Sequence, residues 1–422
     1  MSSATSPGSG KPGRTGRRRV VITGAGIVSP IGNDMDSVKA ALLEGKTGVK
    51  VVPEWRSVLG LRSHVAGVVE GIDPKQIPRR YRRTMGRMAV LGTFAAQDAA
   101  ADAGLDEHTL TSERTGIMLA STTGSPANYE TFFGNYVSTG GILGQEGTLF
   151  MRVMSHTVAA NVAAVLGVRG RVLAPCAACA SSTQAIGTGF ETIKEGHQDV
   201  VLCGGAEELH PVTAGIFDVV HAASRNYNDA PERTPRPFDR DRDGLVVGEG
   251  AAVVVLEEYD RARQRGAPIR AELLGWATGC DSRHMTQPGK EGMLRCMQQA
   301  ARSAGISATE LDYICGHATG TPIGDVAEAE ATRAFVGDAV PISSLKGYMG
   351  HTLAACGSAE VICCLLMLQD GFVAPTRNLD NVAEGCDGIA HVREVTGSSL
   401  RLVMSSNFAF GGVNASLVLG KV

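Results

Sequence analysis

One cysteine carries the strongest chemical signal in the sequence. Cys179 lies in the small-residue run Ala174-Pro-Cys-Ala-Ala-Cys-Ala-Ser-Ser182, directly before a predicted helix over 183–195. A cysteine at the start of a helix meets unpaired backbone N–H groups and the positive end of the helix dipole, and both favour the thiolate. The sequence therefore predicts a nucleophilic thiol at Cys179.

Two histidines far along the chain could work with this thiol. His317 lies in Gly316-His-Ala-Thr-Gly-Thr-Pro-Ile-Gly-Asp325, and His351 ends the turn Lys346-Gly-Tyr-Met-Gly-His351. Glycine lets the backbone approach a ligand closely, and imidazole can donate a hydrogen bond or move a proton near neutral pH. One cysteine with two such histidines indicates acyl transfer through a thioester.

Two charged residues and one turn could support that chemistry. Lys346 opens the turn that ends in His351, and Glu328 follows Asp325 by about one helical turn. Opposite charges there would orient the rings and tune their protonation, although both could be ordinary surface charges. Asn407-Phe-Ala-Phe-Gly-Gly412 could aim backbone N–H groups at an oxyanion, or could be a plain hairpin with two core phenylalanines.

The pair Cys176-Ala-Ala-Cys179 has other interpretations. A Cys-x-x-Cys can be a redox pair or half of a zinc site, and a buried structural thiol is a third alternative. A second pair with zinc spacing is absent from the sequence, so we expect no metal site. The ten cysteines have no regular spacing, and a cytoplasmic chain of this size needs no disulfide scaffold.

Composition limits the classes of function. The 422 residues are 43 % hydrophobic and 20 % charged with a net charge of −3, which gives no electrostatic case for nucleic-acid binding. The strongest apolar run, 361–368, is too short to span a membrane and is predicted to be a buried helix segment. Residues 1–17 are predicted to be a disordered leader of a cytoplasmic protein; a basic arm touching a polyanion is the alternative.

Strands and helices alternate along the chain, which predicts an α/β architecture with mostly parallel central sheets. Two halves of similar pattern, 18–266 and 267–422, suggest an internal duplication. The predicted strands span 18–24, 115–121, 200–205, 251–256, 271–277, 312–316, 341–345, 400–405 and 415–419. The predicted helices span 36–44, 85–103, 183–195, 257–265, 292–304, 325–335 and 353–370.

From about residue 18 to the end, the chain resembles the β-ketoacyl-(acyl carrier protein) synthases, the condensing enzymes of the thiolase superfamily. Besides the motifs above, the segments 19–32 and 236–250 carry the resemblance. It implies a thiolase-like five-layer α-β-α-β-α fold of two duplicated halves. The first half would carry the nucleophilic cysteine and the second half the two histidines.

The resemblance also implies roles for the site residues. Cys179 matches the nucleophile that takes up the acyl chain. His317 and His351 match the pair that binds the malonyl thioester and assists its decarboxylation, with Lys346 and Glu328 as a supporting ion pair.

Three further positions match residues around the substrate. Phe408 matches the residue that gates the pocket, and its N–H together with that of Cys179 matches the oxyanion hole. Thr319 and Thr321 match threonines that hold the phosphopantetheine arm. No bound cofactor is implied, because the substrates arrive on the phosphopantetheine of an acyl carrier protein.

Some positions depart from the usual family pattern. They are Pro175, Cys176 and Ala177 before the nucleophile, Ala318 beside the first histidine, and Ala409 between the phenylalanines. None removes a reactive group. They suggest a specialised synthase rather than a housekeeping fatty-acid one, and the turn Lys346-Gly-Tyr-Met-Gly-His351 resembles that of polyketide or polyene pathway members. We therefore expect decarboxylative condensation in a type II polyketide pathway, possibly a polyene pathway. The alternatives are a general fatty-acid elongation synthase (KAS II-like) and, from another class, a non-catalytic chain-length or partner subunit.

The expected partners are an acyl carrier protein and a second subunit. Carrier proteins are acidic, and Arg82 and Arg83 belong to the densest basic cluster of the predicted fold. We therefore expect carrier docking at these two arginines; a solvated helix start is the alternative. The resemblance implies a dimer, either a homodimer or a heterodimer with a paralogous chain-length factor, and neither nucleic acid nor a membrane is an expected partner.

Overall fold

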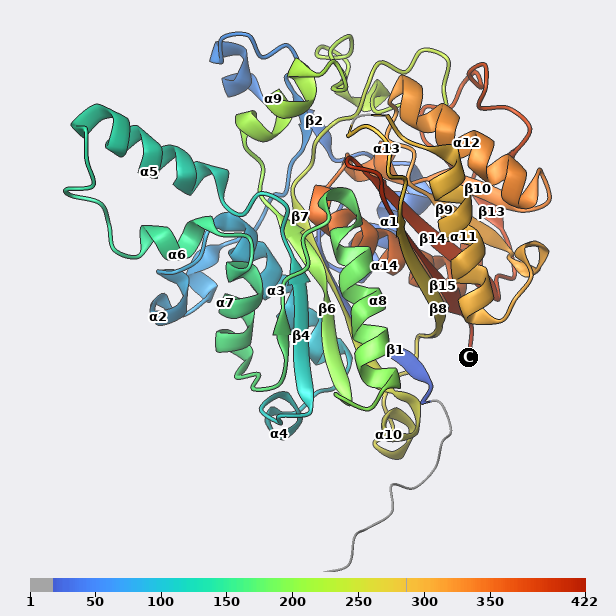
Figure 1. Ribbon diagram of the computed structural model, residues 1–422, viewed down its shortest axis with the longest axis horizontal. Coiled ribbons are helices and arrows are strands. Elements are labelled where there is room, and N and C mark those ends of the chain that lie inside the picture. The colour runs from blue at the N-terminus through green and yellow to red at the C-terminus, as the bar shows by residue number, and fades with distance from the viewer. Residues whose placement is uncertain (1–17, 286) are drawn as a thin grey trace, which may run out of the picture.

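The computed structural model describes residues 18–285 and 287–422, so the predicted leader lies outside the described residues. In this part of the chain, eleven strands form one mixed sheet in the order β12-β10-β9-β14-β15-β8-β1-β7-β6-β4-β5 (Figure 1). The strands are β1 (Val20–Val28), β4 (Thr115–Ala120), β5 (Val172–Leu173), β6 (Val200–Glu207), β7 (Gly250–Glu258), β8 (Ala271–Cys280), β9 (Tyr313–Gly316), β10 (Pro341–Ser344), β12 (Ala390–His391), β14 (Leu402–Ala409) and β15 (Val413–Gly420). Two small two-stranded sheets lie outside it: β2 (Val49–Val51) with β3 (Val65–Gly67), and β11 (Phe372–Val373) with β13 (Thr396–Gly397).

The two halves of the sheet repeat one topology. The order β1-β7-β6-β4-β5 in the first half matches β8-β15-β14-β9-β10 in the second, and the strand directions agree pair by pair. The halves join where β1 pairs antiparallel with β8, at Val21–Glu272 and Ile22–Ala271. The predicted duplication is therefore confirmed, while the division at residue 266, between the halves, stays a prediction.

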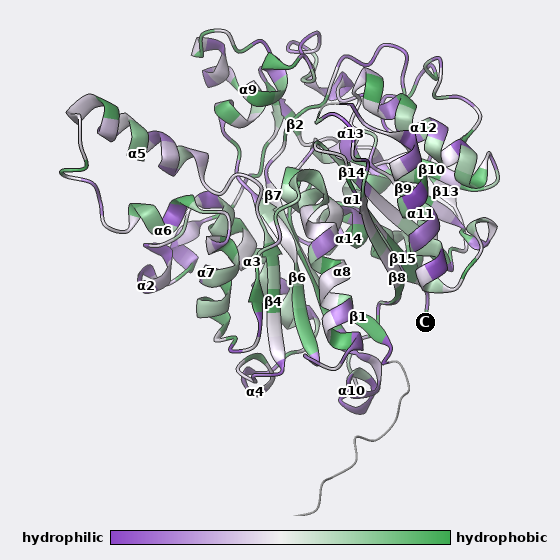
Figure 2. Cartoon of the chain, in the orientation of Figure 1, coloured by the Kyte–Doolittle hydropathy of each residue, from purple (hydrophilic) through white to green (hydrophobic). Residues whose placement is uncertain are grey.

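The prediction of mostly parallel sheets was wrong. In the first half, β7 pairs antiparallel with β1 and with β6, and only β4 pairs parallel, with β6 and with β5. The second half has the same pattern. The apolar runs that suggested parallel strands report burial on both faces of the sheet. Helices supply that burial here, whatever the direction of the strands (Figure 2).

Helices divide the fold into five layers. Helix α3 (Arg87–Asp102) packs on β1, β6 and β7, and α11 (Lys290–Ala304) packs on β8 and β15. Between the halves, α8 (Ser181–Lys194) and α14 (Cys356–Asp370) contact each other and strands of both halves. This is the predicted α-β-α-β-α order. Cys179 and His351 lie shortly before the two central helices, and His317 follows β9.

The central helix α14 explains the most apolar stretch of the sequence. By length and hydropathy alone Leu353–Asp370 could cross a membrane, but 89 % of that stretch is buried inside the protein. The helix ends at Gly371, whose φ of +70° suits glycine at a helix C-terminus. The prediction of a buried helix segment is confirmed.

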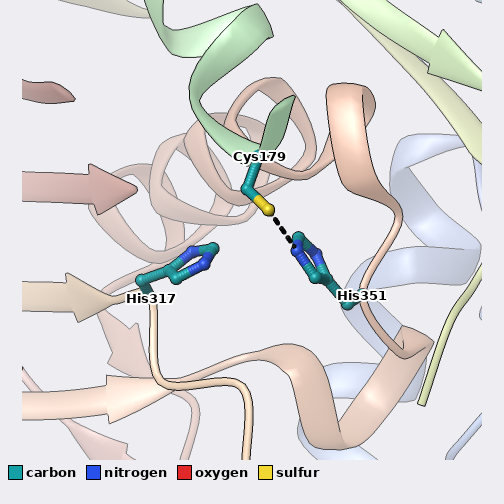
Figure 3. Close-up of side chains that lie close together, drawn as sticks. All are labelled: Cys179, His317 and His351. Atoms are coloured by element: carbon teal, nitrogen blue, oxygen red, sulfur yellow. Dashed lines mark hydrogen bonds between the residues drawn. The ribbon is translucent and has the colours of Figure 1, made fainter. Parts of the chain in front are cut away.

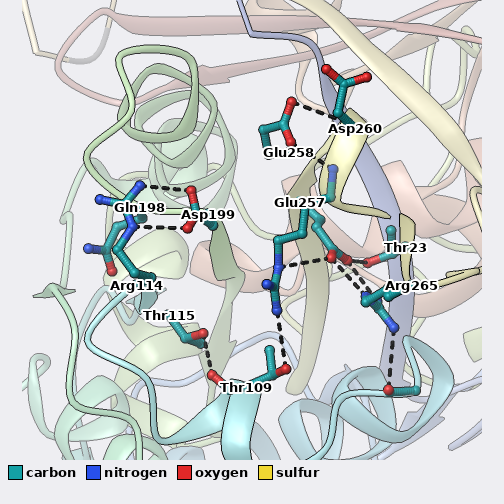
Figure 4. A network of polar contacts seen from close by, with 12 residues as sticks. Thr23, Thr109, Arg114, Thr115, Gln198, Asp199, Glu257, Glu258, Asp260 and Arg265 are labelled. Carbon is teal, nitrogen blue, oxygen red and sulfur yellow. Dashed lines mark hydrogen bonds and ion pairs between the residues drawn. The ribbon is translucent and has the colours of Figure 1, made fainter. Parts of the chain in front are cut away.

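Other helices were predicted with shifted ends or were missed. The predicted helix over 257–265 starts later, as α10 (Tyr259–Gln264), because β7 continues to Glu258, whose side chain caps the helix. Glu257 still belongs to the strand, with its side chain fully buried against Thr23 and Arg265 (Figure 4). The other helices that matched predictions are α1 (Met35–Glu44) and α12 (Pro322–Val336). The helices without a prediction are α2 (Arg79–Arg82), α4 (Glu107–Leu110), α5 (Pro126–Thr139), α6 (Leu149–Val153), α7 (Thr157–Leu166), α9 (Pro211–Val219) and α13 (Lys346–Met349).

Helix α5 was not predicted, and no residue of it is buried. Its large apolar residues do recur at the spacing of one helix face, but that face is not turned to the core of this chain. These residues are Tyr129, Phe132, Phe133, Tyr136 and Val137. In Figure 1 it projects from the body of the protein together with α6.

Candidate active site

A tight turn aims Cys179 into a cavity. The turn is the 3-10 helix η3 (Ala178–Ala180), in which Ala178 has a φ of +46°, an uncommon conformation for a residue with a side chain. Ser181 closes the turn: its Oγ accepts from the N–H of Ala177 and donates to the carbonyl of Ala178. Cys179 is 5 % exposed, and it lines a cavity of about 460 Å³.

The two predicted histidines meet this cysteine (Figure 3). His317 follows β9, and His351 follows the single turn of α13. Nε2 of His351 lies 2.8 Å from Sγ of Cys179, and the two imidazole centroids are 5.2 Å apart and nearly perpendicular. One sulfur and two imidazoles, contributed by both halves of the fold, therefore face one small volume.

These three side chains also form the only group among the described residues whose Cys, His or carboxylate atoms lie close enough to ligate one ion together. Their donor atoms lie within 4.8 Å of one another. A metal site and a Cys-His-His acyl-transfer site both need these three side chains close together. Their closeness alone therefore does not tell which of the two kinds of site this is.

Burial keeps the site uncharged. It raises the pKa of the Cys179 thiol to about 12, against the lowering effects of Lys346 and of the backbone N–H groups of Cys179 and Phe410. Burial, followed by the positive charge of Lys346, lowers the pKa of both His317 and His351. The expectation that the helix start would favour a thiolate is therefore wrong for the free protein, because desolvation outweighs the helix dipole.

Lys346 forms its ion pair with a residue that the sequence analysis did not single out. Its Nζ lies 2.5 Å from Oε1 of Glu360, and both side chains are buried. Burial opposes the charge on Lys346, but the attraction of Glu360 and neighbouring groups outweighs it and raises the pKa of the lysine. The predicted Lys346–Glu328 pair is corrected to Lys346–Glu360, since α14 brings Glu360 to the lysine.

The carboxyl group of Glu328 instead accepts hydrogen bonds from backbone N–H groups. Its two carboxyl oxygens accept the N–H groups of His317 and Ala318, both at 2.6 Å. Burial and the nearby Asp325 raise the pKa of Glu328 to about 8. Glu328 therefore fixes the turn that carries His317, and its side chain also lines the cavity.

Phe408 and Phe410 both line the cavity of the nucleophile, but in different surroundings. The N–H of Phe410 reaches the sulfur of Cys179, so this residue has the place that the sequence analysis gave to Phe408. The Phe410 ring is 40 % exposed and stacks on Phe217 with centroids 5.7 Å apart. Phe408 is buried in β14, with its ring edge-on to His317.

The remaining predicted site residues divide into two groups. Thr319 and Thr321 line the cavity, and their hydroxyl oxygens lie 3.1 Å apart. Arg82 and Arg83 lie outside the cavity wall, at the end of α2. Arg82 is half-buried and donates to the carbonyls of Pro74 and Ile77, whereas Arg83 is exposed.

The cysteine pair does not form a disulfide. All ten cysteines are free thiols, and Cys176 is exposed while Cys179 is buried. The two sulfurs thus face different surroundings, although they are close in sequence.

Sequence reasoning missed Glu360, Asn407 and Phe410. Glu360 and Asn407 bear polar side chains in an apolar helix and strand, and a polar residue in such a place signals a buried partner. Nothing in the sequence tells Phe410 from Phe408, because the position of each backbone N–H relative to Cys179 depends on how the chain turns after β14.

Comparison with known proteins now adds to this geometry. Sequence models described as "Beta-ketoacyl synthase, N-terminal domain" and "Beta-ketoacyl synthase, C-terminal domain" match residues 17–262 and 270–380. The 3-oxoacyl-[acyl-carrier-protein] synthase 1 of Haemophilus influenzae is 41 % identical over 411 residues, which are 95 % of this chain and 98 % of the relative. The synthase 1 of Escherichia coli strain K12 is 39 % identical over 408 residues, or 96 % and 99 % of the two chains.

Solved structures show the same fold. A beta-ketoacyl synthase from Burkholderia phymatum has a TM-score of 0.93 at 41 % identity. The ishigamide ketosynthase/chain length factor gives 0.90, and a type II polyketide acyl carrier protein in complex with its ketosynthase gives 0.88, both at 29 % identity. Each comparison covers 96 % of this chain and 100 % of the other.

Proposed function

This chain belongs to the β-ketoacyl synthase family of condensing acyltransferases, and from that premise we propose that it elongates carrier-bound acyl chains in fatty-acid synthesis, in the cytoplasm. The observation that carries the proposal is the meeting of Cys179 with His317 and His351 in one cavity. The substrates are an acyl group and a malonyl group, each carried as a thioester on an acyl carrier protein.

In the first step the acyl chain moves to Cys179. The thiol gives its proton to Nε2 of His351, 2.8 Å away, as the sulfur attacks the acyl thioester. The carbon–sulfur bond to the carrier breaks, and the carrier leaves as a thiolate that takes a proton from solvent, while His351 keeps the thiol proton on Nε2. The high pKa of Cys179 suits this order, because the proton leaves only when an acyl group is there to be attacked.

In the second step malonyl loses carbon dioxide. The breaking carbon–carbon bond leaves its electron pair as an enolate, whose oxygen accepts hydrogen bonds from the imidazoles of His317 and His351. The enolate carbon then attacks the acyl group on Cys179, and the thiolate of Cys179 leaves and takes its proton back from Nε2 of His351. The positive charge of Lys346 lies near both rings and favours negative charge in the cavity.

Backbone N–H groups stabilise the tetrahedral intermediate of both steps. Those of Cys179 and Phe410 both face the sulfur, so we assign them as the oxyanion donors. Thr319 and Thr321 line the same cavity and supply hydroxyl groups for the amide-rich phosphopantetheine arm.

We propose a dimer as the working form. Helix α5 and the loop after it expose large apolar side chains, among them Val137 at 79 % and Leu143 at 90 %, and β5 is a free sheet edge. A second subunit would cover both features. One solved relative is a ketosynthase with a chain length factor, so sedimentation of the purified chain, alone and with co-expressed paralogues, decides between a homodimer and a heterodimer.

A polyketide pathway is the second candidate. One neighbour in structure carries a type II polyketide name and another is a ketosynthase with a chain length factor. Both are 29 % identical to this chain, against 41 % and 39 % for the two 3-oxoacyl-[acyl-carrier-protein] synthase relatives. Steady-state assays with saturated and with polyunsaturated acyl carriers separate the two. A higher kcat/KM on saturated chains supports fatty-acid elongation, and a preference for polyunsaturated chains supports the polyene pathway.

The central test is Cys179→Ala. The variant should take up no acyl group from acyl carrier protein, as measured by intact-protein mass, but should still decarboxylate malonyl carrier protein through the two histidines. Cys176→Ser is the matched control and should load normally. Acyl loading that persists in Cys179→Ala would refute the assignment, and a wild type that never loads would favour the non-catalytic partner subunit.

A further inference from the structure

A buried asparagine next to the site has no role in the steps above. Asn407, in β14, is fully buried and lies at a junction of four elements: its own strand, α8, α14 and the turn of His317. A buried amide is retained only where its hydrogen bonds are satisfied. Its partners therefore indicate its task.

The orientation of the Asn407 amide is fixed from two sides. Its Oδ1 accepts from the hydroxyl of Thr183 at 2.5 Å, and its Nδ2 donates to Oε2 of Glu360 at 2.7 Å. Sγ of Cys356, at 3.6 Å from Nδ2, is the longest contact of the amide and a weak acceptor. Glu360 also accepts from Lys346, so it is a carboxylate and has no proton to give. A flipped amide would set its oxygen against that carboxylate, which excludes the flipped form.

The same Nδ2 lies 3.2 Å from Nδ1 of His317. Because the amide nitrogen can only donate, Nδ1 of His317 must accept, and the proton of the neutral ring must be on Nε2. We propose that Asn407 is a positioning residue that fixes His317 in its Nε2–H tautomer, so that His317 donates to the substrate oxygen while His351 alone takes the thiol proton. This inference rests on the proposed function and adds a division of labour between the two imidazoles.

The packing around Asn407 leaves room for its hydrogen bonds. Gly357 lies at the start of α14, and a Cβ there would overlap both Oγ1 of Thr183 and Oδ1 of Asn407. Glycine at this position leaves the space in which the hydroxyl and the amide meet. The chain from Lys346 through Glu360 and Asn407 to His317 is continuous, and all four residues are 5 % exposed or less.

The test separates the two half-reactions. Asn407→Asp is made in a Glu360→Gln background, with Glu360→Gln alone as its reference, so that positions 360 and 407 hold one carboxylate between them and it stays ionised. It keeps the shape of the side chain but offers an acceptor to Nδ1, which moves the ring proton to Nδ1 and removes the donor from Nε2. We expect malonyl decarboxylation to fall by about 10²-fold, the usual loss when one oxyanion donor is removed. Acyl loading of Cys179, which uses His351, should stay within about threefold. Ser406→Ala, which alters a buried hydroxyl on the same strand away from the cavity, is the control and should change neither rate.

A second pair of variants guards against misfolding of Asn407→Asp. Thr183→Val removes the hydroxyl that orients the amide and should lower decarboxylation selectively, whereas Thr183→Ser keeps the hydroxyl and should restore it. Spectra of the ring nitrogens with ¹⁵N-labelled histidine should show a protonated Nε2 in His317 of the wild type and a protonated Nδ1 in Asn407→Asp. His317→Gln assigns the signal.

Two outcomes would overturn the inference: equal loss of both half-reactions in folded Asn407→Asp, or unchanged decarboxylation in Asn407→Asp and Thr183→Val. Neither outcome would touch the proposed function, which fails only if the wild-type protein does not load an acyl group or does not decarboxylate malonyl.

Discussion

Nε2 of His351 lies 2.8 Å from Sγ of Cys179, and both groups are uncharged in the free protein. Burial is the first cause of both pKa shifts, upward for the thiol and downward for the imidazole. A thiolate–imidazolium pair would need each pKa shifted the other way. Cys179 is therefore a protonated thiol in the free protein, and it loses its proton only when a substrate enters.

This neutral pair predicts slow alkylation of Cys179 at neutral pH. A thiol whose pKa is raised to about 12 has a very small thiolate fraction at pH 7, and that fraction grows about tenfold with each pH unit. The rate of reaction with iodoacetamide should therefore rise steadily between pH 7 and about 10 without a plateau. Mass spectrometry of the Cys179 peptide gives the rate, in a background where the exposed Cys176 and Cys280 are serine. A plateau at pH 8–9 would show an ordinary or activated thiol instead.

Removal of one partner of the Lys346–Glu360 pair should destabilise the fold. Lys346→Met leaves Glu360 as an unpaired buried carboxylate, which costs about 3–5 kcal/mol in free energy of unfolding. The double variant Lys346→Met/Glu360→Leu should regain part of this loss, since it removes both charges. Urea denaturation followed by tryptophan fluorescence measures both, with the exposed Lys421→Met as a neutral reference. A single variant as stable as that reference would contradict a buried ion pair.

The two neighbouring phenylalanines should behave differently. Phe410→Ala removes an exposed ring but keeps the N–H that faces Cys179, so stability should change by less than about 1 kcal/mol while the rate of acyl loading changes severalfold. Phe408→Ala removes a buried ring and should cost about 3–5 kcal/mol. Thermal unfolding and a loading assay on both variants test this. If Phe408→Ala alone altered loading at full stability, the gate would be Phe408 after all.

Carrier docking at the end of α2 remains a prediction. Arg83 is exposed, and charge reversal in Arg83→Glu should raise the KM for acyl carrier protein about tenfold, with a smaller effect at high salt because free charges are screened. Arg82→Glu should act similarly but also disturb the carbonyls that Arg82 holds. Arg401→Glu, another exposed arginine, is the control. An unchanged KM in Arg83→Glu would move the docking surface elsewhere.

The sequence by itself determined the alternation of strands and helices, the two halves, and the three groups Cys179, His317 and His351. These follow from local patterns: apolar runs, glycine at helix ends, and reactive side chains in small-residue turns. Local patterns also account for the buried helix α14, whose apolar face is continuous along the chain.

Only the tertiary structure decided which groups act together and in what state of charge. The partner of Lys346 is Glu360 because α14 passes beside α13, and the N–H that faces the sulfur belongs to Phe410 because of the turn after β14. Strand direction and the high pKa of Cys179 were likewise beyond sequence patterns. Both depend on what packs around a segment, and desolvation in particular is set by residues that lie hundreds of positions away.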